Sequence, residues 1–408
     1  MLISFVFAND ATIEVIKKAD ALPSIAVEDA SISYDNTFRL RFFKTLIADL
    51  NVLSIFNVER HRHIANYDDV DVFVKNREMD YVLRYKIFED DSAALNVQIK
   101  LLQKNKEVYS RNYRVGKQDI FMFISHAIAY DINDFMGAPS VAWMKRKVIF
   151  SHIIAPMKSE IVIADYTLSY QHTILKGGFN LFPKWANKAQ NAFYYTVLDA
   201  GKPTLKYVDI KSGKIKNIIS SDGMMVCSDV SSDGKILLLT MALHGQPDIY
   251  SFNTVTRKYK RLTRYSGIDV NAQFMGKNQI VFISSRLGYP NVFSKRLDTN
   301  EVEQMVYYGR SNSACSAHGN YIVYKARESS NAFSQNTFNL HLISTKTDFI
   351  RRLTATGVNE FPRFSKDGDA IIFIKNYKRQ SAMGIIRLHH NKNYLFPLKY
   401  GKIQSMDW

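Results

Sequence analysis

A strand–turn–strand pattern that recurs about every 44 residues constrains the fold of this chain more than any other feature. Its clearest copy is residues 360–374, EFPRFSKDGDAIIFI, in which Asp367-Gly368 separates two apolar runs. This pairing predicts a tight hairpin, because glycine adopts positive φ without steric cost. Equivalent positions in successive copies, spaced 45, 44, 41 and 49 residues apart, are Trp185, Val230, Phe274, Cys315 and Phe364. Such a period, with about four strands per repeat, is typical of the blades of a β-propeller.

The two ends of this repeat region predict how the ring closes. Three strands are expected at 147–152, 160–166 and 172–176, before the first complete repeat, and Trp408 lies 44 residues after Phe364. Residues 403–408 (IQSMDW) are therefore predicted to form the innermost strand of the first blade, which removes exposed sheet edges. The alternative is that Val141–Met144 supplies this strand and the tail is loose. Both interpretations give a six-bladed β-propeller over residues 137–408.

Residues 9–136 show a different pattern, that of a small α/β domain. Strands are expected at 24–28, 53–58, 81–88, 93–102 and 106–115. One helix is expected from Asp35 or Asn36 to about residue 51, a second over 68–78 and a third from near Lys117, on the spacing of apolar residues. The predicted fold class is thus α/β followed by all-β, with the boundary at Gly137-Ala138-Pro139.

The first residues indicate export. Residues 1–8, MLISFVFA, are nearly all apolar and end in a small residue, as does a secretory signal peptide whose basic start is missing. Residues 9–20 follow as a first strand of the domain or as a free arm that binds a partner by strand addition.

The distribution of charge indicates which kinds of partner to expect, and the positions of the two cysteines indicate whether they form a disulfide. The net charge of +16 is uneven, because residues 1–135 sum to −3 and the remainder to +19. The basic part favours an acidic partner or polymer, and nucleic acid is not expected because no basic helix or aromatic-basic reading motif is found. Cys227 and Cys315 are expected to be free thiols, since inner strands of different blades surround a channel.

Catalytic motifs are not evident in this sequence. There is no Gly-x-Ser-x-Gly, phosphate loop or dinucleotide fingerprint. His61 and His63 adjoin Arg60 and Arg62, which disfavours a metal, and no cofactor is expected. The alternative, a propeller lyase or hydrolase with an active site in the channel, would require titratable residues on the inner strands. The repeat positions instead hold packing residues.

Several short motifs resemble one known family. Residues 364–368 (FSKDG) and 230–234 (VSSDG) are close to Phe-Ser-Pro-Asp-Gly, and Ile163-Ala164-Asp165-Tyr166 and the Arg-Leu-Thr endings at 261–263 and 352–354 also match. With the domain order, these resemble the TolB family, periplasmic β-propeller proteins of the Tol-Pal system. The resemblance spans the whole chain, although the repeats at Trp185, Phe274 and Cys315 lack the Asp-Gly turn.

The resemblance implies a monomeric, non-enzymatic periplasmic adaptor that supports outer-membrane integrity and constriction at cell division. It implies binding of the lipoprotein Pal by the propeller and of TolA by the mature N-terminal segment, with other envelope proteins or peptidoglycan as further partners. We expect Pal to contact the loops before each innermost strand and after each second strand, with the candidates Asn180, Asp269, Asn271, Arg286, Asn312, Asn359 and Glu360. The expected TolA-binding residues are Thr12, Ile13, Glu14, Val15, Ile16 and Lys17. No transmembrane segment is expected.

Overall fold

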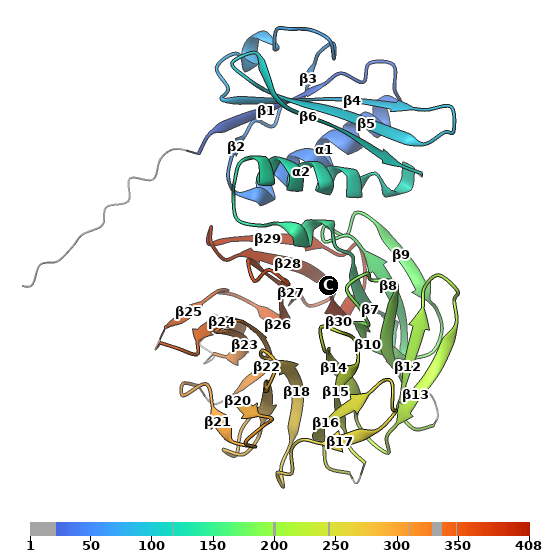
Figure 1. Ribbon diagram of the computed structural model, residues 1–408, viewed down its shortest axis with the longest axis vertical. Helices are drawn as coiled ribbons and strands as arrows, with labels where there is room; N and C mark the ends of the chain where they lie inside the picture. Colours follow the sequence, from blue (N-terminus) through green and yellow to red (C-terminus); the bar gives the residue numbers. More distant parts are fainter. Residues whose placement is uncertain are drawn as a thin grey trace, which may run out of the picture.

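A small α/β region stacks on a β-propeller in the computed structural model of the chain (Figure 1). The described residues are 22–116, 118–198, 201–243, 245–309, 311–328, 337–347 and 349–408. The predicted fold class is confirmed within these ranges. The expected signal segment, residues 1–8, and the expected arm, residues 9–20, lie outside the described residues.

The α/β region contains one mixed sheet and two long helices. Its sheet has the order β2-β1-β4-β5-β6, with β3 also paired to β1. The helix α1 (Asn36–Leu53) begins at Asp35, whose carboxylate accepts a hydrogen bond from the backbone N–H of Phe38 at 2.7 Å. The strands are β1 (Ser24–Asp29), β2 (Asn57–Val58), β3 (His63–Ile64), β4 (Tyr81–Glu89), β5 (Leu95–Gln103) and β6 (Lys106–Val115), and the second helix is α2 (Met122–Phe135).

The helix predicted over 68–78 is wrong. This segment contains only a 3₁₀ turn, η1 (Val74–Asn76). The buried guanidinium of Arg84 donates to the backbone oxygens of Asp69 (2.6 Å) and Asp71 (2.8 Å). Because tertiary hydrogen bonds occupy these carbonyl groups, the segment is held in an irregular path.

The strand predicted over 53–58 is also largely wrong. Helix α1 continues through Leu53, and Ser54 then ends it with a left-handed φ of 64°. Only Asn57 and Val58 pair in the sheet. The apolar run at this place belongs to the last turn of the helix.

Among the described residues, the propeller consists of six four-stranded blades. The fifth and sixth blades are joined by a single parallel pair, Phe338 with Val358. From the innermost strand outward, the second blade is β10 (Asn180–Trp185), β11 (Ala192–Val197), β12 (Thr204–Asp209) and β13 (Ile215–Ser220). The third is β14 (Met225–Val230), β15 (Ile236–Met241), β16 (Asp248–Asn253) and β17 (Tyr259–Arg261). The fourth is β18 (Asp269–Phe274), β19 (Gln279–Ser284), β20 (Asn291–Arg296) and β21 (Val302–Gln304). The fifth is β22 (Asn312–His318), β23 (Tyr321–Arg327), β24 (Phe338–Ser344) and β25 (Ile350–Arg352), and the sixth is β26 (Val358–Phe364), β27 (Ala370–Asn376), β28 (Ser381–Arg387) and β29 (Lys392–Pro397).

The first blade takes its strands from distant parts of the chain. Strand β30 (Lys402–Asp407) pairs antiparallel with β7 (Val148–Ala155), which continues to β8 (Lys158–Ala164) and β9 (Gln171–Leu175). The predicted closure by the tail is confirmed. The alternative strand at Val141–Met144 is wrong, because residues 142–145 form a 3₁₀ turn, η3 (Ala142–Lys145), in which Trp143 and Met144 are buried.

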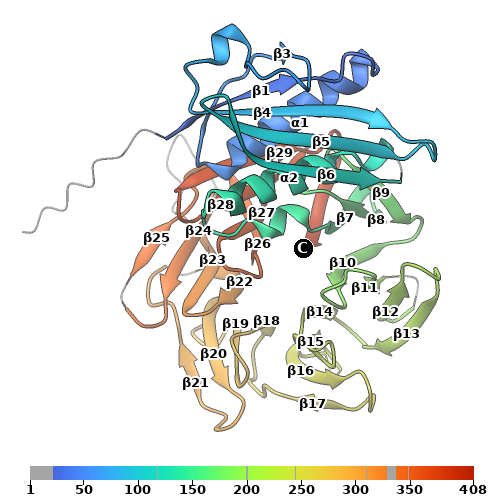
Figure 2. The same cartoon turned by 45° about the horizontal axis from the view of Figure 1, so that its top comes forward.

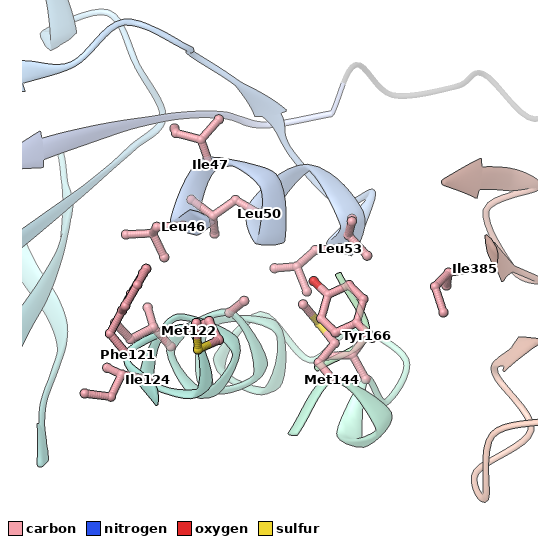
Figure 3. Close-up of a cluster of buried hydrophobic side chains, with 14 of the residues drawn as sticks. Leu46, Ile47, Leu50, Leu53, Phe121, Met122, Ile124, Met144, Tyr166 and Ile385 are labelled. Carbon is pink, nitrogen blue, oxygen red and sulfur yellow. The ribbon is translucent and has the colours of Figure 1, made fainter. Parts of the chain in front are cut away.

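The α/β region and the propeller share one hydrophobic core. Helices α1 and α2 lie between the α/β sheet and the first and sixth blades (Figure 2). Leu53 of α1, Tyr166 and Met144 lie close together within this core, and Ile385 of β28 belongs to the same cluster (Figure 3). The buried Arg387 donates to the backbone oxygen of Leu53 at 3.1 Å, so a propeller side chain binds a carbonyl at the C-terminus of α1.

Candidate protein-docking face

One end of the propeller channel is surrounded by exposed apolar side chains. We call it the loop face, because it is formed by the loops before each innermost strand and after each second strand. Tyr307, Tyr308 and Tyr400 expose 71%, 69% and 67% of their surface in these loops. The further exposed apolar residues of the loop face are Ile154, Met157, Met224, Ile268, Leu287 and Tyr377. Apolar side chains that gather around one opening are typical of a surface that binds another protein.

Three of the predicted Pal-binding residues are buried and hold the loops of this face. Asn180, Asn312 and Asn359 are almost fully buried at or near the start of an innermost strand. Their side-chain amides donate to backbone oxygens in the preceding loop, those of Gly177 (2.6 Å), Tyr308 (2.8 Å) and Thr356 (3.1 Å), respectively. These asparagines fix the path of the loops that precede their strands.

Two further predicted residues, Asp269 and Arg286, form an ion pair. A guanidinium nitrogen of Arg286 lies 3.2 Å from a carboxylate oxygen of the fully buried Asp269. The guanidinium also lies 4.9 Å from the centre of the Phe293 ring and 5.2 Å from that of Tyr265. These contacts hold the Arg286 side chain in a defined position, and 22% of it remains exposed.

Asn271 lies where the backbone of an innermost strand is irregular. Its φ is 56°, and the ladder between β18 and β19 shifts register here. Positive φ also occurs at irregular positions of three other innermost strands, at Phe182, Ala314 and Phe361. Because positive φ is unfavourable for residues with a Cβ, this recurrence marks the region as a candidate functional site.

The seventh predicted residue, Glu360, links two blades. It accepts a hydrogen bond from Nζ of Lys325 at 3.0 Å and another from Asn376 at 2.7 Å. Asn271 likewise donates across to the next blade, to the backbone oxygen of Cys315 at 3.4 Å. The structure therefore brings all seven predicted positions to the loop face, but only Asp269 and Arg286 of this set bond to each other.

Sequence reasoning placed its candidate residues in these loops but did not select the exposed apolar residues. It selected polar side chains, most of which are engaged in local bonds. A usable signal was the aromatic residue close to a loop glycine, as in Tyr307-Tyr308-Gly309 and Tyr400-Gly401. The expected TolA-binding residues Thr12–Lys17 lie outside the described residues.

The two cysteines lie deep in the propeller and are free thiols. Burial raises the pKa of Cys227 far above its ordinary value and that of Cys315 to about 12. Thiols of this kind remain protonated at neutral pH and are poor nucleophiles.

Comparison with known proteins decides the family. The family model described as the TolB beta propeller domain matches residues 143–408. The chain belongs to the TolB family. It is 50% identical to the Tol-Pal system protein TolB of Wolinella succinogenes, over 100% of this chain and 98% of that protein. It is 41% identical to the TolB of Campylobacter jejuni strain RM1221, over 98% and 96% of the two chains.

A solved structure supports the same fold. The crystal structure of TolB from Acinetobacter baumannii is similar with a TM-score of 0.75 and 20% identity, over 95% of this chain and 97% of that one. As a member of the TolB family, the chain is a component of the Tol-Pal system. Within the described ranges, the helices are too short or too polar to cross a membrane.

Proposed function

We propose that this protein is a non-enzymatic periplasmic adaptor that binds Pal through the loop face and TolA through residues 12–17. In this role it supports outer-membrane integrity and constriction during cell division. The observation that supports the propeller site best is the set of exposed apolar side chains around one mouth of the channel. Buried aromatic anchors within a polar surround supply most of the binding energy in many protein interfaces.

The loop face is also suited to binding because its backbone is held in place before a partner arrives. Asn312 and Asn359 are buried and hydrogen-bonded, and the Asp269–Arg286 pair is fixed by two rings. A surface that is already ordered loses little conformational entropy on binding. We therefore expect Pal to dock on this face with little movement of the propeller backbone.

The Pal site is tested by titration calorimetry with the soluble domain of Pal. We expect the double substitution N271A/R286A, and separately Y307S/Y308S, to weaken binding at least about tenfold, the loss typical of a hot-spot residue. The control is K277S, an exposed lysine at the opposite end of the channel. Unchanged affinity in both double variants would exclude the loop face as the Pal site.

The TolA site is tested by deleting residues 9–18. We expect this deletion to abolish TolA binding and to leave Pal binding intact, because the two sites lie on separate parts of the chain. Strand addition would explain the alternating apolar residues of this segment. If the deletion instead unfolds the α/β region, the segment is a structural strand and the proposal fails.

An enzymatic role is not favoured by the channel. Its innermost strands carry an ion pair in which Lys184 lies 2.8 Å from Asp407 and 3.4 Å from Asp229. This arrangement links three neighbouring blades. We propose that these residues stabilise the ring and do not catalyse a lyase or hydrolase reaction.

A further inference from the structure

The opposite end of the channel, which we call the turn face, opens into a basic cavity. The turns between the first and second strands of the blades form this face. The cavity has a volume of about 910 Å³ and is lined by more cationic than anionic side chains. The seven cationic residues are Arg146, Lys184, Lys188, Lys260, Lys277, Arg363 and Lys366, and the three anionic residues are Asp229, Asp233 and Asp407.

The three carboxylates leave most of this positive charge unmatched. Asp229 and Asp407 both contact Lys184, and Asp233 accepts a hydrogen bond from the Ser231 hydroxyl at 2.6 Å. The seven cationic residues outnumber the three carboxylates of the cavity, and they still do so if a terminal carboxylate at Trp408 is added. The cavity therefore has a positive potential that would attract anions.

Two arginines of the cavity have buried nitrogens without partners. Nε and one terminal nitrogen of Arg363 are buried without a hydrogen bond, and no ion pair of this side chain is found among the described residues. Arg146 donates from one nitrogen to the backbone oxygen of Lys188 at 3.0 Å, and its Nε and other terminal nitrogen have no partner. Both side chains are partly buried, and buried nitrogens are normally hydrogen-bonded, because a buried donor without a partner is destabilising.

Burial and the surplus of positive charge both act on the pKa of Lys366. Partial burial and then the neighbouring Arg146 lower its pKa to about 8, while Asp407 acts in the opposite direction and Lys188 and Lys184 lower it further. An anion bound beside Lys366 would favour its charged form.

We propose that the turn-face cavity binds a soluble multivalent phosphate compound. Three cationic groups line the cavity. Arg363 lies at the end of β26 and Lys366 in the turn that follows, whereas Arg146 comes from the segment before β7. Phosphate oxygens accept hydrogen bonds from several directions, and arginine guanidinium groups match them with paired N–H donors. The volume of the cavity accommodates more than one phosphoryl group, and the number of cations matches a ligand with several negative charges.

This site is tested by titration calorimetry of the full chain with tripolyphosphate and, in a separate arm, with inorganic phosphate. We expect saturable binding of tripolyphosphate at 0.15 M salt and weaker binding of inorganic phosphate. R363Q and R146Q should each weaken tripolyphosphate binding at least tenfold. The control is K392Q, which removes one positive charge from an exposed residue of the outermost strand of the sixth blade and should bind as the unsubstituted chain does.

Several results would overturn the proposal. The first is the absence of saturable tripolyphosphate binding, and the second is unchanged affinity in both arginine variants. The third is that K392Q weakens binding as much as the arginine variants do, which would indicate attraction to net charge alone. Because an arginine variant of the cavity can fail to fold, thermal unfolding of each variant is measured, and K366Q at the exposed turn is the further variant. K366Q should also weaken binding, and its unchanged affinity would contradict the site.

Discussion

His126 of α2 lies 3.1 Å through its Nε2 from a carboxylate oxygen of Asp165, the residue that follows β8 of the propeller. Its Nδ1 lies 2.8 Å from Asp49 of α1, and all three side chains are fully buried. Asp49 also accepts a hydrogen bond from the hydroxyl of Tyr166. One imidazole therefore connects the α/β region to the propeller through charged hydrogen bonds in a fully buried environment.

The first prediction concerns this connection. Replacing His126 with Gln or Asp165 with Asn leaves a buried charge without its partner, and we expect each to lower the free energy of unfolding by about 3–5 kcal/mol. Chemical denaturation measures the change. The control is R296Q, which breaks an exposed pair with Asp298 and should change stability by less than about 0.5 kcal/mol. A loss below about 1 kcal/mol for both buried variants would contradict the role given to His126.

The second prediction is a pH dependence of stability. Burial disfavours the charged imidazole, but Asp49 and Asp165 outweigh burial and raise the pKa of His126 to about 10. This stabilisation is complete below the ordinary pKa of histidine, near 6.5, and is lost as the pH rises toward 10. Burial raises the pKa of Asp165, but its bonds to His126 outweigh this and lower it, so its contribution is lost as the pH falls below 3.8.

This pH dependence is measured by thermal unfolding between pH 4 and pH 10, at intervals of about half a unit across the range in which His126 titrates. The difference in melting temperature between the unsubstituted chain and H126Q should shrink as the pH rises above 6.5. A constant difference across this range would show that the imidazole is not charged in the folded protein.

The third prediction concerns closure of the ring. Strand β30 pairs with β7, and the Asp407 carboxylate accepts from the backbone N–H of Trp185 at 2.9 Å and from Lys184. Removing residues 402–408 exposes the edge of β7 and leaves Lys184 with Asp229 alone. We expect cooperative unfolding at a clearly lower temperature, together with a tendency to aggregate through the open edge. An unchanged melting temperature would contradict closure by the tail.

The fourth prediction tests backbone strain in the innermost strands. Ala314 has a φ of 50°, which is unfavourable for a residue with a Cβ. We expect A314G to stabilise the protein by about 0.5–1 kcal/mol, because relief of strain exceeds the entropy that glycine gains in the unfolded chain. The control A272G, at a buried position outside the positive-φ set, should destabilise it by a similar amount.

The sequence predicted the architecture because the repeat leaves a signal in every blade. It was less accurate in the fifth blade, where Cys315 was taken as the repeat position. Ala317, which pairs with Ile322 next to the turn, occupies the place that Phe274 and Phe364 have in their blades. Its spacings of 43 and 47 residues are more even than those of Cys315. In this blade the repeat position lies five residues before its partner in the second strand, Ile322, whereas in the sixth blade Phe364 lies seven residues before Ile371. A count made back from the second strand therefore placed the repeat position two residues too early.

Contacts between distant segments explain the remaining differences. The composition of segment 68–78 is typical of a helix. However, the side chain of Arg84, in strand β4, donates hydrogen bonds to the backbone oxygens of Asp69 and Asp71. Asp49 and His126 lie on the buried faces of two helices, and only the folded structure shows that they meet Asp165. The polar residues selected for Pal binding lie on the same face as the exposed tyrosines, and the sequence could not predict the exposure of those tyrosines because it depends on how the loops pack.

The most direct test of the central claim is hydrogen–deuterium exchange of the full chain with and without the soluble domain of Pal. We predict slower exchange in the loops around Met224, Ile268, Tyr307-Tyr308 and Tyr400, with the turn face and the outer strands unchanged. Protection confined to the turn face or the outer strands, or no protection at saturating Pal, would contradict the proposal that the loop face is the docking site.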